Sequence, residues 1–367
     1  MIRFTVVSAR VPATGTSGFA MIVMIGIVVM LGGCASLHDG VVTASGNGFV
    51  LPEVPSGTEV VMIPALPDRG FQVEYFLYIP GDIRRGDPVR LLVQSNNTGR
   101  VSDSHRMHRD RARTDAESGW ARYVAEALSV PLLVPAFDRP EVIGMTYTHA
   151  LDRDTLEIAD GRQERIDLQL LAMIDHASEL LATEGITVED RVWMFGFSAS
   201  GNFANRFAAI HPGRVRAVAT GGVNGMPVIP AEFREGRSIP YHVGLGDLAD
   251  LTGHRFDGCR YRMVSQYIFM GETDENDTIP YGDAYNEAER RITVELLGQT
   301  MAERWLRSQE IYRELEIPAQ FVTYRGVGHG MNPAIAGDVV AFFRANDSQG
   351  FAAIMPSAPT AEGLAAR

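Results

Sequence analysis

Ser198 stands in a segment whose residue types suit a nucleophile. The run Gly196-Phe197-Ser198-Ala199-Ser200 follows a short apolar stretch and leads directly into an amphipathic, helix-like pattern. A sharp strand-to-helix turn lifts a serine hydroxyl above the sheet and needs small residues two positions before and after the serine. Gly196 and Ser200 meet that need. The pattern predicts attack by Ser198 Oγ, with the backbone N–H of Ala199 stabilising negative charge on the substrate oxygen.

Two later segments supply groups that could activate this serine. His329 lies in the glycine-rich run 325–331, and the flanking glycines leave an imidazole room to transfer a proton between nucleophile and leaving group. The run 271–277 carries carboxylates after another apolar stretch. We prefer Asp274 as the acid that orients His329 and stabilises its imidazolium, with Asp277 as the alternative acid and Asp247 as a third candidate. These residue types together indicate acyl transfer.

Strands and helices must position these loops. Short β-rich runs, which we predict to be strands, alternate with helical patterns, and these runs cover 59–63, 72–79, 89–94, 131–134, 191–195, 217–220, 266–270 and 319–324. The clearest helical pattern covers 163–182, where apolar residues recur on one stripe. We therefore predict an α/β fold, a mostly parallel twisted sheet of about eight strands with helices on both faces. Ligands of such sheets bind at the carboxyl ends of the strands.

The serine segment, the acid loop and the Gly-Val-Gly-His-Gly loop together resemble the α/β-hydrolase superfamily over roughly 58–345. The stretch from Ser198 to His211-Pro212 is similar to the branch that contains polyhydroxyalkanoate depolymerases and feruloyl-esterase-like proteins. Ser200 departs from the usual motif, which has glycine there. The resemblance implies the chain order serine, acid, histidine and a two-step reaction through a covalent acyl-enzyme. It implies an ester substrate and no metal or organic cofactor.

The resemblance also places a second oxyanion donor in the loop after the third strand. We nominate the backbone N–H of Asn97 or Thr98 for that role. Two pairs of side chains could suggest metal ligands, namely His105 with His108, and His254 with Cys259. Because two residues make no metal site, we expect none, and we interpret the first pair as part of a mobile surface segment.

Composition excludes several other chemistries. All 33 basic residues are arginine, so Schiff-base lysines, serine–lysine dyads and lysine P-loops are excluded. The formal net charge of -12 disfavours a nucleic-acid partner, since phosphate binding relies on clustered cations. A chain of 367 residues with 46% hydrophobic content can bury the core of one large domain.

The first 33 residues predict a bacterial lipoprotein signal peptide. Arg3 and Arg10 precede an apolar run at 19–31, which is too short to span a membrane and suits a signal-peptide core. The run ends in a Leu-Gly-Gly-Cys sequence that resembles a lipobox, so Cys34 is the predicted site of lipid attachment. An uncleaved membrane anchor is the alternative. The residues after Cys34 include no early aspartate, which favours the outer membrane, on the periplasmic side of the cell envelope.

The predicted organisation follows from these segments. A signal peptide at 1–33 and a lipidated tether at 34–57 precede an α/β-hydrolase domain at 58–345, and a flexible tail occupies 346–367. The domain carries an insertion at about 221–265. Because loops above the sheet select substrates in such folds, this insertion and the segment 102–119 are candidate pocket walls.

Three functions fit these observations. The preferred one is an exported, membrane-anchored hydrolase of carboxylic esters, acting on a polyester or on a plant-derived or lipid ester. A peptidase of the same fold would use the same triad. In the third, a non-catalytic envelope lipoprotein keeps the fold, and Ser198 or Ser200 only caps a helix. The sequence sets no oligomeric state.

Overall fold

The computed structural model describes residues 60–141, 146–280 and 284–347. The predicted signal peptide, the tether with Cys34 and nearly all of the predicted tail lie outside the described residues. Within the described ranges, none of the helices combines the length and apolar character needed to cross a bilayer.

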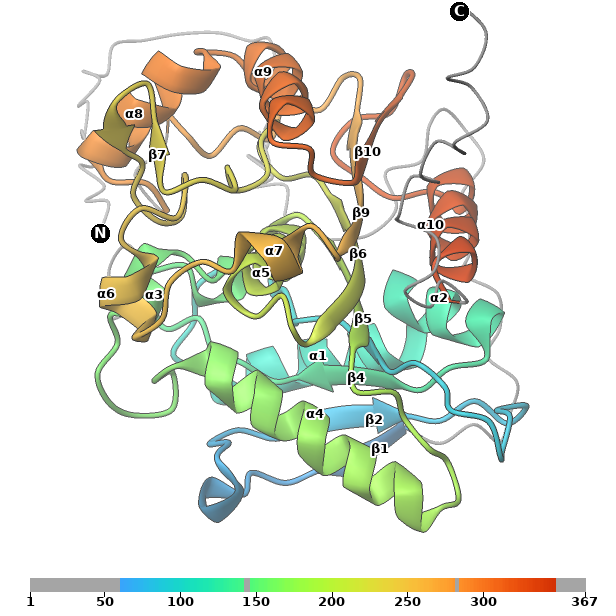
Figure 1. Cartoon of the computed structure of the whole chain (residues 1–367). Coiled ribbons are helices and arrows are strands. Elements are labelled where there is room, and N and C mark those ends of the chain that lie inside the picture. The colour runs from blue at the N-terminus through green and yellow to red at the C-terminus, as the bar shows by residue number, and fades with distance from the viewer. Residues whose placement is uncertain (1–59, 142–145, 281–283, 348–367) are drawn as a thin grey trace, which may run out of the picture. The chain divides into compact units, whose positions relative to one another are not determined.

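An eight-stranded sheet with the order β1-β2-β4-β3-β5-β6-β9-β10 organises the described region (Figure 1). Its strands are β1 (Val60–Ile63), β2 (Tyr75–Tyr78), β3 (Leu92–Val93), β4 (Leu132–Pro135), β5 (Val192–Phe197), β6 (Val215–Gly221), β9 (Ser265–Gly271) and β10 (Ala319–Tyr324). Strand β2 pairs antiparallel with β1 and β4, and all other pairs are parallel. The eight predicted strands and the mostly parallel sheet are confirmed.

The strands are apolar along their length because both faces of the sheet are covered. Successive side chains of a strand point to opposite faces. In β5, Val192 and Met194 join one buried cluster, whereas Trp193 and Phe195 join the cluster on the opposite face. The uninterrupted apolar runs are therefore a consequence of two separate cores, one on each side of the sheet.

Helices cover these two faces. Helices α4 (Ile166–Thr183) and α5 (Ala199–Ile210) pack in one cluster, and α1 (His105–Ser118), α2 (Trp120–Leu128) and α10 (Pro333–Ala345) pack in the other. Figure 1 shows α5 and α10 on opposite sides of the sheet. Helix α4 confirms the helix predicted at 163–182, although it begins three residues later. The shorter helices α3 (Arg153–Leu156), α6 (Leu248–Thr252) and α7 (Gly258–Tyr261) lie in the connections.

A third, smaller core holds the connections on either side of β9. Ile229, Ile239 and Val243 from the predicted insertion pack with Leu296 of α8 (Glu287–Leu297) and Ile311 of α9 (Met301–Glu314). The insertion also forms a short hairpin, β7 (Phe233–Arg234) with β8 (Arg237–Ser238). These connections follow β6 and β9, so they build walls at the carboxyl ends of the central strands.

The interpretation of His105 and His108 as part of a mobile surface segment is wrong. Both lie in α1, where His108 is buried and its ring contacts the carbonyl oxygen of Ser102 at 2.9 Å. His105 contacts the carboxylates of Glu74 and Asp138 at 2.9 and 2.5 Å. The sequence does not indicate this helix because its segment is rich in arginine and its buried residues are two alanines, a histidine and an aspartate, so its apolar period is weak.

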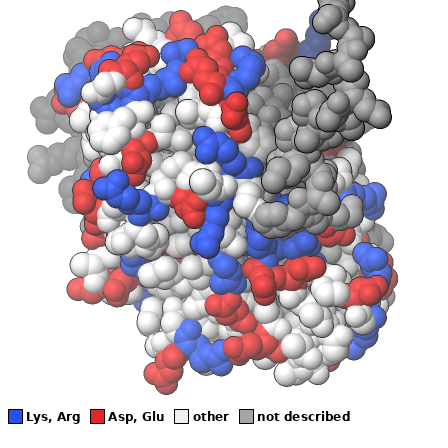
Figure 2. Space-filling model, in the orientation of Figure 1, with Lys and Arg blue, Asp and Glu red and all other residues white. Residues whose placement is uncertain are grey.

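Surface charges of both signs lie next to one another on the face shown in Figure 2. Exposed ion pairs among the described residues include those of Arg214 with Asp175 and of Arg234 with Glu314, each at 2.6 Å. The described part of this face is therefore mixed in charge rather than of one sign.

Candidate active site

Ser198 occupies a strained turn between β5 and α5. Its backbone has φ 60° and ψ -127°, a region that residues with a side chain rarely adopt. Two hydrogen bonds hold it there: the Ser198 N–H donates to the Gly221 carbonyl at 2.9 Å, and the Asn202 N–H donates to the Ser198 carbonyl at 3.0 Å. Strain of this kind persists only where the surroundings determine it, and it is found at functional sites.

The residues two positions on either side of Ser198 explain how the turn closes. A Cβ atom on Gly196 would lie 2.1 Å from the Ser200 carbonyl oxygen, so only glycine fits there. The Ser200 hydroxyl accepts from the Phe197 N–H at 3.0 Å and donates to the Phe197 carbonyl at 2.9 Å. Serine in place of the usual glycine is thus accommodated, because its hydroxyl bonds back to the strand end.

We expect Gly196→Ala to destabilise the fold by about 3 kcal/mol or more, because the new methyl group would overlap the backbone of α5. Thermal unfolding of the full-length protein measures this. Gly213→Ala is the matched control, since a Cβ there meets no atom closer than 3.5 Å and should change the unfolding temperature little. Equal unfolding temperatures for the two variants would contradict the steric argument.

His329 and Asp274 meet where β9 and β10 end side by side. The two strands are parallel, with Gly271 opposite Tyr324. His329 Nδ1 lies 2.9 Å from Asp274 Oδ2 and 3.1 Å from Oδ1. A Cβ on Gly271 would lie 2.2 Å from the Val327 carbonyl oxygen, so this glycine allows the two loops to approach. The carboxylate is positioned to hold the N–H on Nδ1 and leave Nε2 as a base.

The two alternative acids have other partners. Asp277 forms an ion pair with the buried Arg304, with 2.6 Å between Oδ2 and Nη2. Asp247 pairs with Arg153 and accepts a hydrogen bond from the Tyr241 N–H. Of the three carboxylates considered from the sequence, the structure brings Asp274 to His329.

The imidazole lies beside the pocket that Ser198 lines. Gly222 and Asn276 line that pocket together with Ser198, and both also adjoin His329. A Cβ on Gly222 would lie 2.8 Å from His329 Cε1, and Asn276 Nδ2 lies 3.2 Å from His329 Nε2. The Phe197 ring packs 4.8 Å from the imidazole, centroid to centroid. The structure thus places His329 and Asp274 beside the pocket that Ser198 lines, with the Asn276 amide next to His329 Nε2.

Asn276 offers a test of this geometry. We expect Asn276→Asp to lower activity at pH 7 by about 10- to 100-fold, because a carboxylate beside Nε2 favours the charged imidazolium, which accepts no proton. The acid limb of the kcat/KM profile should move to higher pH. Asn276→Ala is the control and should stay within about tenfold of the wild type at all pH values. An unchanged profile in the aspartate variant would place Asn276 away from the reacting nitrogen.

The two nominated groups for the second oxyanion position lie elsewhere. The Asn97 N–H bonds to the Asp115 carboxylate, and the Thr98 N–H donates to His149 Nδ1 at 3.3 Å. Neither residue is among those that line the pocket. The structure therefore does not support that nomination, because both N–H groups are satisfied inside the protein. Ala199 does line the pocket, at the first position of α5, where helical N–H groups have no partner within the helix.

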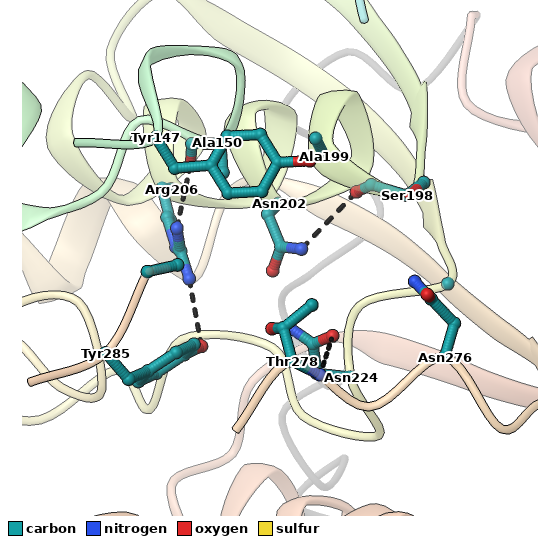
Figure 3. Close-up of a pocket in the computed structure, with 12 residues that line it drawn as sticks. Tyr147, Ala150, Ser198, Ala199, Asn202, Arg206, Asn224, Asn276, Thr278 and Tyr285 are labelled. Carbon is teal, nitrogen blue, oxygen red and sulfur yellow. Dashed lines mark hydrogen bonds between the residues drawn. The ribbon is translucent and has the colours of Figure 1, made fainter. Parts of the chain in front are cut away.

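The pocket contains polar side chains that sequence reasoning did not select (Figure 3). Asn202 and Arg206 come from α5, Asn224 comes from the predicted insertion, and Tyr147 and Tyr285 come from loops. Spacing carried a signal for the first two, since residues 198, 202 and 206 recur every four positions on one helix face. The predicted wall at 102–119 contributes no lining residue, whereas the insertion also contributes Gly222.

No family model and no curated protein matches the sequence. The chain is similar in structure to a poly(aspartic acid) hydrolase from Sphingomonas sp. KT-1, with a TM-score of 0.51 and 16% identity, over 78% of this chain and 97% of that one. A poly(3-hydroxybutyrate) depolymerase from Bordetella parapertussis matches with a TM-score of 0.48 and 18% identity, over 81% and 93%. Together with the sheet order and the strained turn at Ser198, the first of these shows that the chain has the α/β-hydrolase fold.

Proposed function

We propose that this protein is a serine hydrolase that cleaves carboxylic esters, with Ser198 as nucleophile, His329 as base and Asp274 as the orienting acid. The observation that carries the proposal is the contact of His329 Nδ1 with Asp274, 2.9 Å long, beside the pocket that holds the strained Ser198. A buried carboxylate on one imidazole nitrogen leaves the other nitrogen to take a proton from a serine hydroxyl.

The reaction begins with acylation of Ser198. The hydroxyl takes the place of the Asn276 amide at His329 Nε2, gives its proton to that nitrogen and forms a bond to the ester carbonyl carbon. The carbonyl oxygen becomes an oxyanion and accepts the Ala199 N–H. When the intermediate collapses, the bond to the alcohol oxygen breaks, and the imidazolium gives its proton to the leaving alcohol.

Water completes the cycle by the same route. It gives a proton to His329 Nε2 and attacks the acyl carbon, and the new oxyanion is stabilised as before. Collapse breaks the bond to Ser198 Oγ, which recovers its proton from the imidazolium, and the carboxylic acid is released. Asp274 keeps its charge throughout and stabilises each imidazolium.

Labelling and turnover test the proposal directly. The full-length protein in detergent is treated with a fluorophosphonate probe, then offered p-nitrophenyl butyrate and a peptide p-nitroanilide. We expect probe attachment at Ser198 and turnover of the ester. Anilide turnover at a comparable rate would favour the peptidase, and an unlabelled, inactive protein would favour the non-catalytic lipoprotein.

The proposal extends to the location of the enzyme. Cys34, which lies outside the described residues, is proposed as the lipid-bearing residue that anchors the enzyme in the bacterial envelope, on the periplasmic side of the outer membrane. A single acyl chain binds membranes only marginally, so stable anchoring needs more than one chain, as a diacylglycerol supplies.

We expect Cys34→Ala to release the protein from membranes, because the acceptor thiol is lost. Fractionation of cells that express each form, followed by immunoblotting, measures the distribution. Cys259→Ala is the matched control, since it removes an exposed thiol in the described domain and should leave the membrane fraction unchanged. Membrane attachment that persists in Cys34→Ala would indicate an uncleaved anchor instead.

A further inference from the structure

Arg206 is a buried cation in the wall of the candidate active site. It lies on α5, is 3% exposed and lines the same pocket as Ser198. Its guanidinium donates to the Ala150 carbonyl at 2.8 Å and to the Tyr285 hydroxyl at 3.1 Å. Both acceptors are neutral oxygens, and within the described ranges no carboxylate forms an ion pair with this side chain.

An arrangement of this kind is unusual for a charge that serves only packing. Buried charges are normally paired, because taking an ion out of water costs several kcal/mol. A guanidinium has five N–H donors, and the two neutral acceptors leave several of them for another partner. Elsewhere in this protein, the fully buried Arg304 does have its carboxylate, Asp277. Arg206 forms no such ion pair among the described residues, although the buried carboxyl group of Asp152 lies near enough to interact with its charge.

The charge of Arg206 affects the groups around it. Burial raises the pKa of Asp152 to about 6 and also raises the pKa of Tyr285, and in both cases the guanidinium opposes the rise. Burial lowers the pKa of His242, and Arg206 lowers it further. His242 packs against Tyr285 with ring centroids 4.4 Å apart. The guanidinium charge therefore reaches the groups around Tyr285, where the Glu289 carboxylate acts on the Tyr285 pKa in the opposite direction.

The guanidinium of Arg206 and the Ser198 side chain lie at different ends of the pocket. Figure 3 shows Ser198 and Asn276 at one end and Arg206 with Tyr285 at the other, with Asn202 between them. Arg206 lies eight positions after Ser198, which corresponds to about 12 Å along a helix axis. Because helical side chains lean toward the N-terminus, the guanidinium covers part of that length. A group bound by Arg206 would thus lie several bonds from the reacting carbonyl.

We propose that Arg206 binds a carboxylate of the substrate, so that the preferred esters carry a negative charge several bonds from the scissile carbonyl. This inference rests on the proposed ester hydrolysis and adds the substrate class to it. A carboxylate would accept guanidinium N–H groups that the two neutral oxygens leave over, and it would add a directly bonded counter-charge to the longer-range attraction of Asp152. Such charge-assisted bonds are about twice as strong as neutral ones. The amide groups of Asn202 and Asn224, which line the same pocket, suit the polar chain between the two ends.

The alternative is that Arg206 only ties the walls of the pocket together through Ala150 and Tyr285. The two roles differ in what they do to matched substrates. A structural tie acts on every ester alike, whereas a carboxylate-binding residue acts on charged esters alone. Selectivity, rather than total activity, is therefore the informative measurement.

The experiment compares p-nitrophenyl monoesters of glutaric, adipic and suberic acid with neutral alkyl esters of the same chain length. For the wild-type protein, we expect kcat/KM to favour the charged member of at least one pair by about 10- to 100-fold. Arg206→Met should abolish this preference, with a loss of charged-ester turnover about 10- to 100-fold greater than its loss of neutral-ester turnover. Arg206→Lys should restore part of it, and Tyr285→Phe, which keeps the guanidinium, should retain it.

Inhibition of the wild-type protein is a second measurement, and it does not depend on whether any variant folds. Adipate should inhibit turnover of p-nitrophenyl butyrate competitively, and the neutral diol of equal length should not. Each of three results would overturn the inference while leaving ester hydrolysis in place. They are a wild-type preference for neutral esters, no inhibition by adipate, and an equal loss on both substrates in a folded Arg206→Met variant. Failure of the fluorophosphonate probe to label Ser198 would instead overturn the proposed function.

Discussion

Ser198→Ala should lower kcat for ester hydrolysis by about 10⁶-fold, because removing the nucleophile of a triad costs nearly as much as removing the whole triad. The residual rate would come from binding and from the oxyanion donors. Long time-course assays, corrected for spontaneous hydrolysis of the ester, measure kcat. Loss of fluorophosphonate labelling tests independently whether Ser198 is the nucleophile. Alanine keeps the Cβ atom and therefore the backbone strain of the turn, so the unfolding temperature should stay near that of the wild type.

Ser200→Ala is the matched control, since it removes a hydroxyl from the same turn. The Ser200 hydroxyl bonds only to the backbone of Phe197, so we expect a loss of about 1 kcal/mol in stability and turnover within about tenfold of the wild type. If Ser200→Ala abolished labelling and Ser198→Ala did not, the assignment of the nucleophile would be wrong.

Asp274→Asn should lower kcat by about 10⁴-fold, the loss expected when the orienting acid of a triad no longer selects the correct imidazole tautomer. The two short contacts between His329 Nδ1 and the Asp274 carboxylate are the reason for this expectation. The pH dependence of kcat/KM and single-turnover labelling would show that the loss lies in activation of Ser198 rather than in binding.

Asp277→Asn should lower the stability of the protein rather than its turnover. Its partner Arg304 is fully buried, so loss of the carboxylate charge should cost about 3 kcal/mol in stability, measured by chemical unfolding. Turnover per folded molecule should stay within about tenfold of the wild type. A stable but inactive Asp277→Asn protein beside an active Asp274→Asn protein would reverse the assignment of the acid.

Some features of the site depend on residues that are close together in the sequence, and these features are predictable from the sequence. The strained turn at Ser198 was predictable because its requirement for glycine at 196 and a small residue at 200 is steric and lies within five residues. The loop containing His329 was predictable because it follows an apolar strand directly. Both predictions use only residues that are neighbours along the chain.

The eight strands, the mostly parallel sheet and helix α4 are predictable from the sequence alone, since periodic apolar residues reflect which faces are buried. Three features become visible in the folded protein alone. Asp274 contacts His329 while Asp277 pairs with Arg304, the N–H groups of Asn97 and Thr98 bond inside the protein, and Arg206 lines the pocket. These outcomes depend on pairings between side chains far apart in the chain. Local sequence patterns do not specify such pairings, because each candidate loop offers the same chemical groups. Packing then brings one of these groups within hydrogen-bond distance of its partner.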